Sequence, residues 1–455
     1  MAGLLGLLDL GSGAINAQDA GVAVSGRNTA NVNTEGYSVE SVNLSAQVGG
    51  PLLSGVVAGD TTRATDNFLS TKEWMAAGDQ GLSSTAATVT ASLTQTITPQ
   101  GQGLVQAYSS LFGSFNALAA SPTDTPLRQQ VTNNAQQLAL SYQQMAASIA
   151  QSQAEADANI KAIAQSATAL AQQIAKLNAT ISTHSDPTLL DQRDLAARQL
   201  AAMTGGHARV DPDGMMRVVV GSGQVLVDGA HAASLQTSVD SAYGNHLKIS
   251  VVDGNHSADV TSALGGRLGA HVQLRDVTAA NAAAALDQLA YDTATKINAV
   301  HSAGAALDGS TGHNLFAAPT QVAGAAAAMA VDPSVAANPA LVAAGQVAGG
   351  SGDGSNALAI SALNDQLLAG GNTATFTDQA ISIVDNVGVA AKNATDQSTL
   401  DNSRVDVLAA ARASVSGVSQ QEELAKLAQF QHASEAAAKF VSVVNDLLGN
   451  LITNL

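Results

Sequence analysis

Residue types that carry catalytic chemistry are present, but not in the spacing that catalysis needs. The sequence contains no Gly-Lys phosphate loop, no His-Glu-x-x-His, no Gly-x-Ser-x-Gly and no Gly-x-Gly-x-x-Gly after a strand. Cysteine is absent, which excludes disulfides, thiolate nucleophiles and cysteine-ligated zinc. The nine histidines are scattered without the spacing of metal ligands. We therefore expect no enzyme activity, no catalytic residues, no cofactor site and no metal site.

Two polar clusters are the remaining candidates for chemistry. Residues 349–356 (GGSGDGSN) resemble a calcium loop in composition but lack its closing Glu, so we interpret them as a flexible loop. Asp191, Arg193 and Asp194 stand at the start of a predicted short helix. Carboxylates there interact favourably with the helix dipole, and an Asp–Arg pair stabilises packing. We favour this packing role over general acid–base catalysis.

Composition narrows the function classes further. The 455 residues are enough for two or three domains. Lys and Arg number 19 against 36 Asp and Glu, a net charge of −17, and so acidic a chain repels nucleic-acid phosphates. No window approaches 18 uninterrupted apolar residues, and residues 1–10 lack a basic segment followed by a cleavage site. We expect no nucleic-acid binding, no membrane insertion and no cleaved signal peptide.

The elements that must carry the function are helices, and the C-terminal one has the clearest pattern. Apolar residues there alternate four and three apart, the 3.5-residue repeat of a helix packed against another helix. Phe440, Leu447 and Ile452 lie beside this seam and widen it, so we expect more than one neighbouring helix. The predicted interface residues are Phe430, Val441, Val444, Leu448, Leu451 and Leu455.

The N-terminal segment has a weaker stripe. Leu8, Ile15 and Val22 recur every seven residues, but glycines interrupt the segment, and each interior Gly costs about 0.5–1 kcal/mol of helix stability. Neither terminal helix can hide its stripe alone. Either the two helices pair with each other, or their apolar stripes stay exposed until another chain covers them. The alternative to an assembly role is an ordinary buried helix pair in a globular domain. We interpret both ends as assembly elements and Leu8, Ile15 and Val22 as interface residues.

Between the ends the periodicity changes several times. Helical spacing dominates except in a Gly-rich, turn-rich arm and in a stretch whose period switches to two. The predicted fold class is therefore mainly α with a β insert: terminal helices forming a coiled coil, a discontinuous helical bundle and a small β-rich outer domain. We expect the bundle to close without the insert. The predicted segments are the N-terminal coiled-coil helix 1–38, the linker arm 39–69, the first part of the bundle 70–204, the insert 205–265, the second part of the bundle 266–412 with an irregular stretch at 302–354, and the C-terminal helix 413–455.

The most specific motif is SGRNTANVNTEGYS at residues 25–38, preceded by AINAQ at 14–18. It resembles the N-terminal signature of flagellar axial proteins, in which an A-x-x-A-Q-like helix runs into N-x-A-N-x-N-T-x-G-Y. Asn side chains cap helix ends, a Gly permits a positive φ, and the Tyr can anchor the following arm. The resemblance adds to the predicted assembly interface the residues Asn28, Asn31, Asn33, Gly36 and Tyr37.

Segments at the C-terminal end and in the middle of the chain also resemble flagellar axial proteins. Residues 416–423, SGVSQQEE, are similar to the family's S-G-V-N-x-x-E-E, with Ser419 in place of the usual Asn. Three further segments, in family order, resemble the hook-associated protein 1 (FlgK) family: residues 111–122, 189–195 and 265–276. A hook or rod protein, the rival within the class of axial proteins, lacks the last two segments.

The resemblance implies a structural protein of the bacterial flagellum, exported unfolded through the flagellar type III apparatus without a cleaved signal. It would be extracellular, in an adaptor ring that joins hook to filament. The implied partners are other copies of itself, the hook protein, the second hook–filament junction protein and an export chaperone. The family often carries a sizeable outer β region after the segment at 314–316, and we expect that region to be reduced or absent here. A secreted adhesin or hydrolase exposing the insert is the alternative from another class, which the absent site chemistry disfavours.

Overall fold

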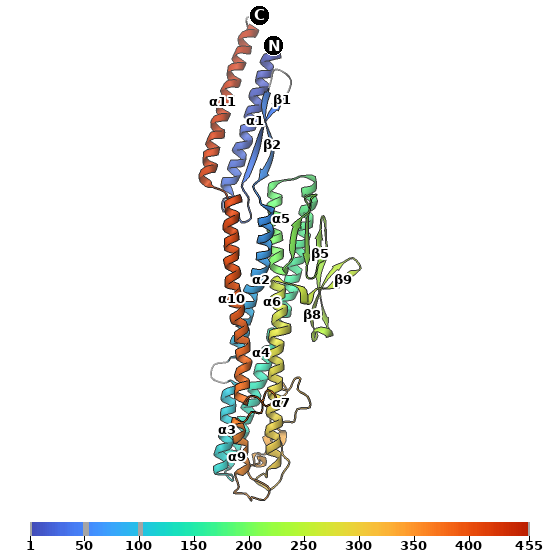
Figure 1. Cartoon of the computed structure of the whole chain (residues 1–455), viewed down its shortest axis with the longest axis vertical. Helices are drawn as coiled ribbons and strands as arrows, with labels where there is room; N and C mark the ends of the chain where they lie inside the picture. The colour runs from blue at the N-terminus through green and yellow to red at the C-terminus, as the bar shows by residue number, and fades with distance from the viewer. Residues whose placement is uncertain (1, 49–53, 99–102, 454–455) are drawn as a thin grey trace.

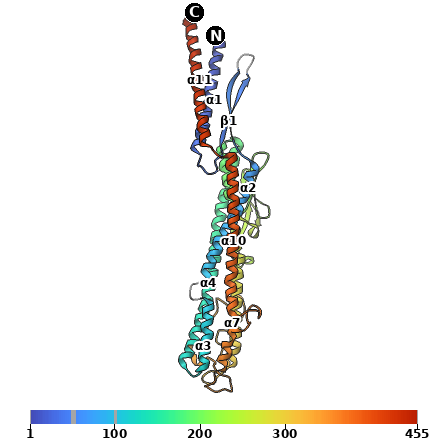
Figure 2. The ribbon, with the colours of Figure 1, turned by 60° about the vertical axis from the view of Figure 1, so that its left-hand side comes forward.

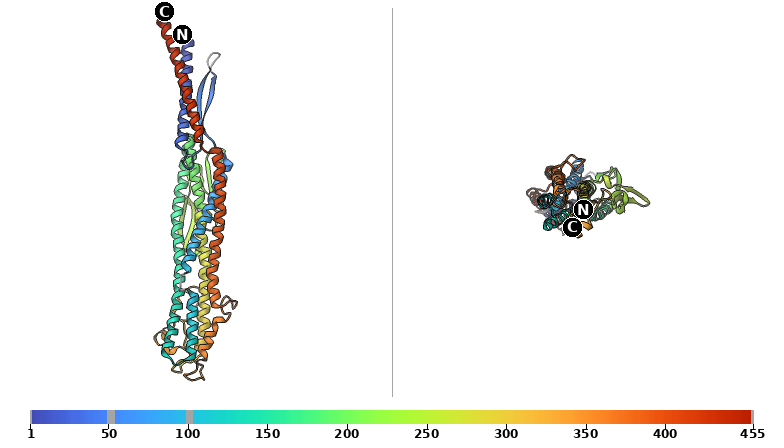
Figure 3. Two further views of the ribbon diagram at one scale, coloured as in Figure 1. Left: turned by 90° about the vertical axis from the view of Figure 1, so that its left-hand side faces the viewer. Right: turned by 90° about the horizontal axis from the view of Figure 1, so that it is seen from below.

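The computed structural model of the chain describes residues 2–48, 54–98 and 103–453. The protein is a long rod with both termini at one end (Figure 1). The terminal helices form that end, a helical bundle forms the rest of the rod, and a β-rich lobe stands out from one side of the bundle (Figures 1 and 3). The predicted fold class, mainly α with a β insert, is confirmed.

The terminal end is a helix pair with a hairpin beside it. α1 and α11 lie side by side in all views (Figure 2), and both hairpin strands contact α1. The strands pair antiparallel, with an irregularity between Val42 and Leu44. The bounds are α1 (Ala2–Ala30), β1 (Glu40–Val48), β2 (Ser54–Arg63) and α11 (Gln420–Thr453).

Two runs of helices, separated in sequence by the β lobe, form one bundle. α2 and α10 pack against each other along the rod, and α4, with 59 residues, is about 90 Å long at 1.5 Å per residue (Figure 1). The bounds are α2 (Asn67–Ile97), α3 (Leu104–Ala120), α4 (Thr125–Thr183), α5 (Pro187–Thr204), α6 (Gly266–Gln273), the π-helix η3 (Leu274–Ala279), α7 (Ala280–Ala303), α8 (Pro333–Ala337), η4 (Pro339–Leu341), α9 (Ser355–Ser361), η5 (Ala362–Asp365) and α10 (Phe376–Ser416).

Aspartate caps set the starts of four of these helices, one of them the short α8, which Asp332 caps. The carboxylates of Asp66, Asp124 and Asp186 accept hydrogen bonds from backbone N–H groups in the first turns of α2, α4 and α5. Pro126 and Pro187 stand in the first turns of α4 and α5, where a missing N–H costs nothing. The last three residues of the predicted 39–69 arm, 67–69, therefore belong to α2.

The β lobe contains two antiparallel sheets. One sheet has the strand order β3-β4-β5-β6, and the other has the order β7-β8-β9. Their bounds are β3 (His207–Val210), β4 (Met216–Val220), β5 (Gln224–Asp228), β6 (His231–Ala232), β7 (Ser234–Asp240), η1 (Ser241–Tyr243), β8 (His246–Asp253), β9 (His256–Asp259) and η2 (Thr261–Ala263).

The lobe shares a hydrophobic core with the bundle. The second half of α4 is rich in Ala and has few large side chains of its own, and strand residues such as Val218 and Ile249 fill the space against it. Hydrogen bonds fix the contact: Leu235 N–H donates to Thr168 Oγ1 at 2.9 Å, and Asn178 Nδ2 donates to the backbone oxygen of Met216 at 2.8 Å. The expectation that the bundle closes without the insert was wrong, because the strands complete this core.

The stretch 302–354 has little regular structure but is packed into a second core, at the far end of the rod from the termini. Leu315, Phe316 and Val335 are fully buried there among side chains of α3, α4 and α7. The side chain of Asn298 in α7 satisfies backbone groups that strand pairing would satisfy in a sheet. Its side chain accepts hydrogen bonds from the N–H groups of Leu315 and Phe316 and donates to the Phe316 oxygen.

Candidate assembly interface

The contact between α1 and α11 is made through glycines. Gly11 and Gly21 are buried on the face of α1 that meets α11. A Cβ atom at Gly21 would lie 2.7 Å from the ring of Phe430, and one at Gly11 would overlap Val441. We expected the glycines only to weaken the N-terminal stripe. Instead they let the two helices approach closely and make room for the large side chains of α11.

The predicted seam residues lie mostly on this contact. Val444 is only 2% exposed, whereas Leu451, near the end of the helix, is 41% exposed. Leu455 lies outside the described residues. A hydrogen bond of 3.0 Å from Ser434 Oγ to Asp19 joins the helices midway. The remaining predicted seam residues are half-buried: Leu8, Ile15, Val22, Phe430, Val441 and Leu448. Their role between protomers stays a prediction.

Apolar side chains beside the seam of α11 are exposed. Val443, Leu447 and Ile452 are 57%, 52% and 68% exposed, and Phe440 is 39% exposed. At 3.6 residues per turn, Phe440, Val443 and Leu447 lie on one side of the seam and Ile452 lies on the other, and the ring of Phe440 also borders Gly11 of α1. A cluster of apolar side chains such as the first three marks an interaction site more often than scattered single residues do. One chain therefore covers the seam of α11 and leaves this flank available for a second neighbour.

A buried hydrogen-bond network joins α1, β1 and α11, and we call its residues, Asn28, Tyr37, Glu40 and Glu423, the joint. Asn28 is completely buried at its centre. The amide of Asn28 donates to the backbone oxygen of Glu40 at 2.8 Å and to the carboxylate of Glu423 at 3.0 Å. Its oxygen accepts from the Tyr37 hydroxyl at 2.7 Å and from the Glu40 N–H at 2.9 Å. Every polar atom of this side chain is thus satisfied.

The two carboxylates of the joint are each held by one cation. Arg27 donates to Glu40 at 2.8 Å, and Lys426 donates to Glu423 at 2.7 Å. Burial opposes ionisation of Glu423, but hydrogen bonds from Lys426 and Asn28 outweigh it, so its pKa lies below the ordinary value. Burial and the nearby Glu40 raise the pKa of Tyr37, so its hydroxyl stays protonated and donates to Asn28.

The other motif residues shape the turn that follows α1. Gly36 has a φ of +86°, which a side chain would strain, and its backbone oxygen accepts a hydrogen bond of 2.9 Å from Arg412 of α10. Asn31 donates to the backbone oxygen of Arg27 at 3.0 Å and so closes the last turn of α1. Asn33 is exposed. The turn thus connects α1 to the end of α10 as well as to the arm.

Arg63, at the end of β2, fastens the arm to the bundle. Its guanidinium contacts Asp191 at 2.5 Å and Asp194 at 2.7 Å, both in α5. Asp191 also accepts hydrogen bonds from the N–H and hydroxyl of Ser38, at 2.8 and 2.9 Å. Burial raises the pKa of Asp194, although Arg63 opposes the shift. The aspartates thus have the packing role that we favoured, but their partner is Arg63, while Arg193 hydrogen-bonds toward the β lobe.

Sequence reasoning missed three charged residues of this region: Arg27, Glu40 and Arg63. Arg27 lies inside the recognised motif and Glu40 lies two residues after it, so their position, in a chain with only 12% charged residues, was the available signal. Arg63 had no local signal, because it is 128 residues from Asp191 in sequence.

Over residues 2–48, 54–98 and 103–453, no group of three or more His, Asp or Glu side chains could hold a metal ion. In the calcium-like loop, Asp353 accepts hydrogen bonds from the N–H groups of Gln346 at 2.7 Å and Ser355 at 3.0 Å, so its carboxylate is used by the turn. No helix in the same described ranges is long and apolar enough to cross a membrane.

Residues 90–316 match the family model of the helical domain of the flagellar hook-associated protein FlgK. The chain is 24% identical to flagellar hook-associated protein 1 of Bacillus subtilis (strain 168), over 97% of this chain and 96% of the relative. It is 23% identical to flagellar hook-associated protein 1 of Salmonella typhimurium, over 66% of this chain and 57% of the relative. The solved structure of the flagellar hook junction protein FlgK from Burkholderia pseudomallei has a TM-score of 0.68 at 18% identity, covering 77% of this chain and all of that one.

At that identity the solved structure shows the fold. The matched range 90–316 includes bundle helices on both sides of the β lobe, and the similarity to the Bacillus protein runs through both terminal helices. The protein therefore has a structural role in the bacterial flagellum, where it associates with other flagellar components. The chain belongs to the FlgK family of flagellar hook-associated proteins.

Proposed function

We propose that the protein is a non-enzymatic adaptor whose copies form a ring between the flagellar hook and the filament. The observation that carries the proposal is the exposed apolar flank of α11, made of Phe440, Val443 and Leu447, beside the close contact with α1. Neighbouring copies in a ring would cover this flank. In that arrangement the α1–α11 pair forms the inner layer and the bundle forms the next layer out, with the β lobe outermost.

The proposed partners are the hook protein on one side of the ring and the second hook–filament junction protein on the other. Export would use the flagellar type III apparatus, with a dedicated chaperone and without a cleaved signal peptide, and would leave the protein extracellular. The names of the relatives, hook-associated protein 1 and hook junction protein, support this placement. The match of residues 90–316 to the FlgK helical domain favours it over a hook or rod protein.

Labelling and cross-linking of isolated flagella test the proposal. An antibody against the protein should mark one point per flagellum, at the boundary of hook and filament, and cross-linking should recover hook and second-junction subunits. Label along the whole hook, along the filament or away from the flagellum would reject the adaptor function.

A matched pair of variants tests the α11 flank. Leu447→Asp puts a charge on the exposed apolar flank, where it leaves the single chain folded but must be desolvated between copies. We expect this variant to be exported and absent from the junction, with filament subunits lost to the medium. Asn445→Asp adds the same charge at an exposed polar position of the same helix and should assemble normally.

A further inference from the structure

Arg193 of α5 is a buried cation with unused hydrogen-bond donors. It is only 2% exposed, and its Nη1 donates to Asn178 Oδ1 at 3.1 Å and to the backbone oxygen of Gly214 at 2.7 Å. Its Nε is buried without a partner. Within residues 2–48, 54–98 and 103–453, no carboxylate forms an ion pair with this guanidinium and no group accepts a bond from Nη2.

The unused edge of Arg193, Nε with Nη2, is the one that recognises carboxylates. The N–H groups on this edge of a guanidinium point the same way and match both oxygens of a carboxylate. Burial of the unpaired cation lowers its pKa, which is the electrostatic cost of leaving the edge without an anion. A carboxylate that reached this edge would remove that cost.

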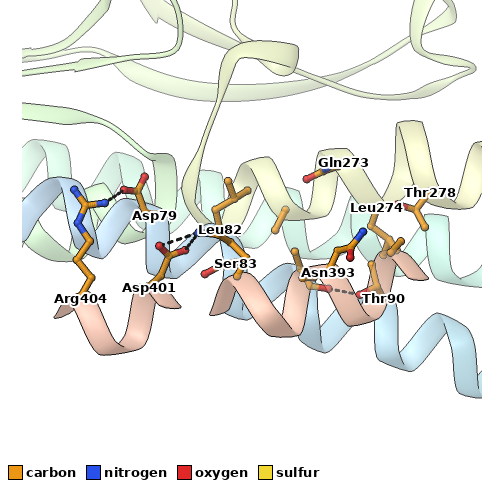
Figure 4. A pocket seen from close by; sticks show the side chains of 15 residues that line it. Asp79, Leu82, Ser83, Thr90, Gln273, Leu274, Thr278, Asn393, Asp401 and Arg404 are labelled. Carbon is orange, nitrogen blue, oxygen red and sulfur yellow. Dashed lines mark hydrogen bonds and ion pairs between the residues drawn. The ribbon is translucent and has the colours of Figure 1, made fainter. Parts of the chain in front are cut away.

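The groove between α2, α6 with η3, and α10 has no such unused charge, although at about 650 Å³ it is large (Figure 4). Arg404 forms an ion pair of 2.9 Å with Asp79, and Asp401 accepts hydrogen bonds from Gln397 at 3.1 and 3.2 Å. Each charged side chain that lines this groove therefore has a partner within the chain. Arg193 is the better candidate for a ligand contact.

Arg193 lines a pocket of about 330 Å³, which we call the α5 pocket. The pocket lies where β2 reaches the bundle beside α5 (Figure 1). Arg63 at the end of β2, Trp74 of α2, Leu190 of α5 and Val210 of β3 also line it. Small-molecule sites in proteins usually have volumes of about 300–1,000 Å³. The α5 pocket is therefore large enough for a small ligand.

Asp194 adds an unused acceptor to the same pocket. Its Oδ2 accepts a hydrogen bond of 2.7 Å from Arg63, but its Oδ1 is buried without a partner. An ammonium group is a donor that would satisfy this oxygen. The pocket is also lined by hydroxyl and amide side chains that make no hydrogen bonds within the described residues: Thr61, Thr65, Asn67 and Ser185.

Charge selects the class of ligand. The chain carries −17, which repels free anions. Around the pocket, Arg63 and Arg193 are already balanced by Asp194 and by Asp191, which Arg63 contacts at 2.5 Å. A ligand that carries one carboxylate and one ammonium group keeps this balance. An α-amino acid is such a ligand, and its two charged groups are held by a single carbon atom.

We propose that the α5 pocket binds a free α-amino acid with a polar side chain. Its carboxylate lies on the unused edge of Arg193, its ammonium group on Asp194 Oδ1, and its side chain among the hydroxyl groups of the pocket. Because the arm, α5 and the β lobe all line the pocket, the bound amino acid holds these three parts together. The inference does not depend on the proposed ring.

The fluorescence of Trp74 measures binding directly, because Trp74 lines the pocket and is the only tryptophan in the sequence. L-Glutamine titrated into the purified full-length chain should change this fluorescence to saturation. Two analogues each lack one of the charged groups: glutaramic acid has no amine, and L-glutaminamide has no carboxylate. Each should bind at least about tenfold more weakly, because it loses a charge-assisted hydrogen bond.

A matched pair of variants tests the role of the guanidinium. Arg193→Lys keeps the positive charge but removes the two-donor edge, so it should weaken L-glutamine binding at least about tenfold. The control is Arg209→Lys, an exposed arginine of β3 outside the pocket, which should bind like the wild type. Val210→Phe narrows the pocket without changing a charge and should also weaken binding. It provides the test if Arg193→Lys does not fold, which circular dichroism would show.

Three results would overturn the proposal. The first is no saturable change with L-glutamine in the folded wild-type chain, which would mean that water alone occupies the pocket. The second is equal binding of L-glutamine and glutaramic acid, which would exclude the contact with Asp194. The third is wild-type binding by both folded pocket variants, which would place the ligand elsewhere on the chain.

Discussion

Replacing Asn28 with Asp exchanges one NH₂ group for an oxygen at the centre of the joint, with almost no change of shape. Asn28 donates to Glu423 at 3.0 Å and to the backbone oxygen of Glu40 at 2.8 Å. The introduced carboxylate cannot donate either bond when ionised. Its new oxygen faces Glu423, which is itself only 1% exposed. The substitution should therefore loosen α11 from α1 and β1.

The size of the effect depends on pH. Two unit charges 3.0 Å apart repel by about 5–6 kcal/mol at an effective dielectric constant of ~20. Protonating the new Asp, with an ordinary pKa of about 3.9, avoids the repulsion at a cost of about 5.6 kcal/mol at pH 8 but only about 1.5 kcal/mol at pH 5. Folding thus raises the pKa of the introduced Asp, and the charge-dependent part of the destabilisation is absent below about pH 4 and grows as the pH rises.

Hydrogen exchange of the α11 amides measures the loosening. Each 1.4 kcal/mol is a factor of about ten, so Asn28→Asp should speed exchange over the wild type by about tenfold at pH 5. At pH 8 the acceleration should reach on the order of 10,000-fold, or bring α11 to the unprotected rate. The control is Asn33→Asp, which adds the same charge at an exposed position of the same motif. The joint would have no such role if both variants exchanged alike, or if the Asn28→Asp effect were equal at pH 5 and pH 8.

Three further changes test the helix pair and the lobe. Gly21→Ala should lower the stability of the α1–α11 pair by about 1–2 kcal/mol in thermal melts, because the added Cβ meets Phe430. Gly26→Ala, which has open space around it, should raise helix stability by about 0.5–1 kcal/mol. A change of the same sign in both variants would contradict the packing. Val444→Asp should make α11 of the free monomer sensitive to proteolysis, while the exposed Leu447→Asp should not; equal cleavage of both would refute the assignment of the two faces. Replacing residues 207–259 by a Gly/Ser linker should reduce the helix signal and the melting temperature, because it uncovers the inner face of α4; an unchanged melt would show that the bundle is self-sufficient.

Features that depend only on residues close together in the sequence could be predicted from it. The 3.5-residue repeat from Phe430 to Leu451 required a helix with an apolar face, and the switch to period two required strands near 207–259. Gly36 was identifiable as a turn residue because few side chains tolerate a φ of +86°. The motif at residues 25–38 indicated a flagellar axial protein, since its spacing is too specific for an arbitrary Asn-rich turn, and the segments 111–122, 189–195 and 265–276 indicated the FlgK family among them.

Features that depend on contacts between distant parts of the chain could be found only in the tertiary structure. Gly11 and Gly21 weaken an isolated helix, and only the position of Phe430 and Val441 makes them a contact surface. The β lobe belongs to the bundle core because an Ala-rich α4 cannot fill that space alone, a deficit invisible in the strand pattern. Periodicity indicates that a helix has two faces. The packing of the chain around α10 decides that Asp401 is buried while Val389 and Val407 are exposed.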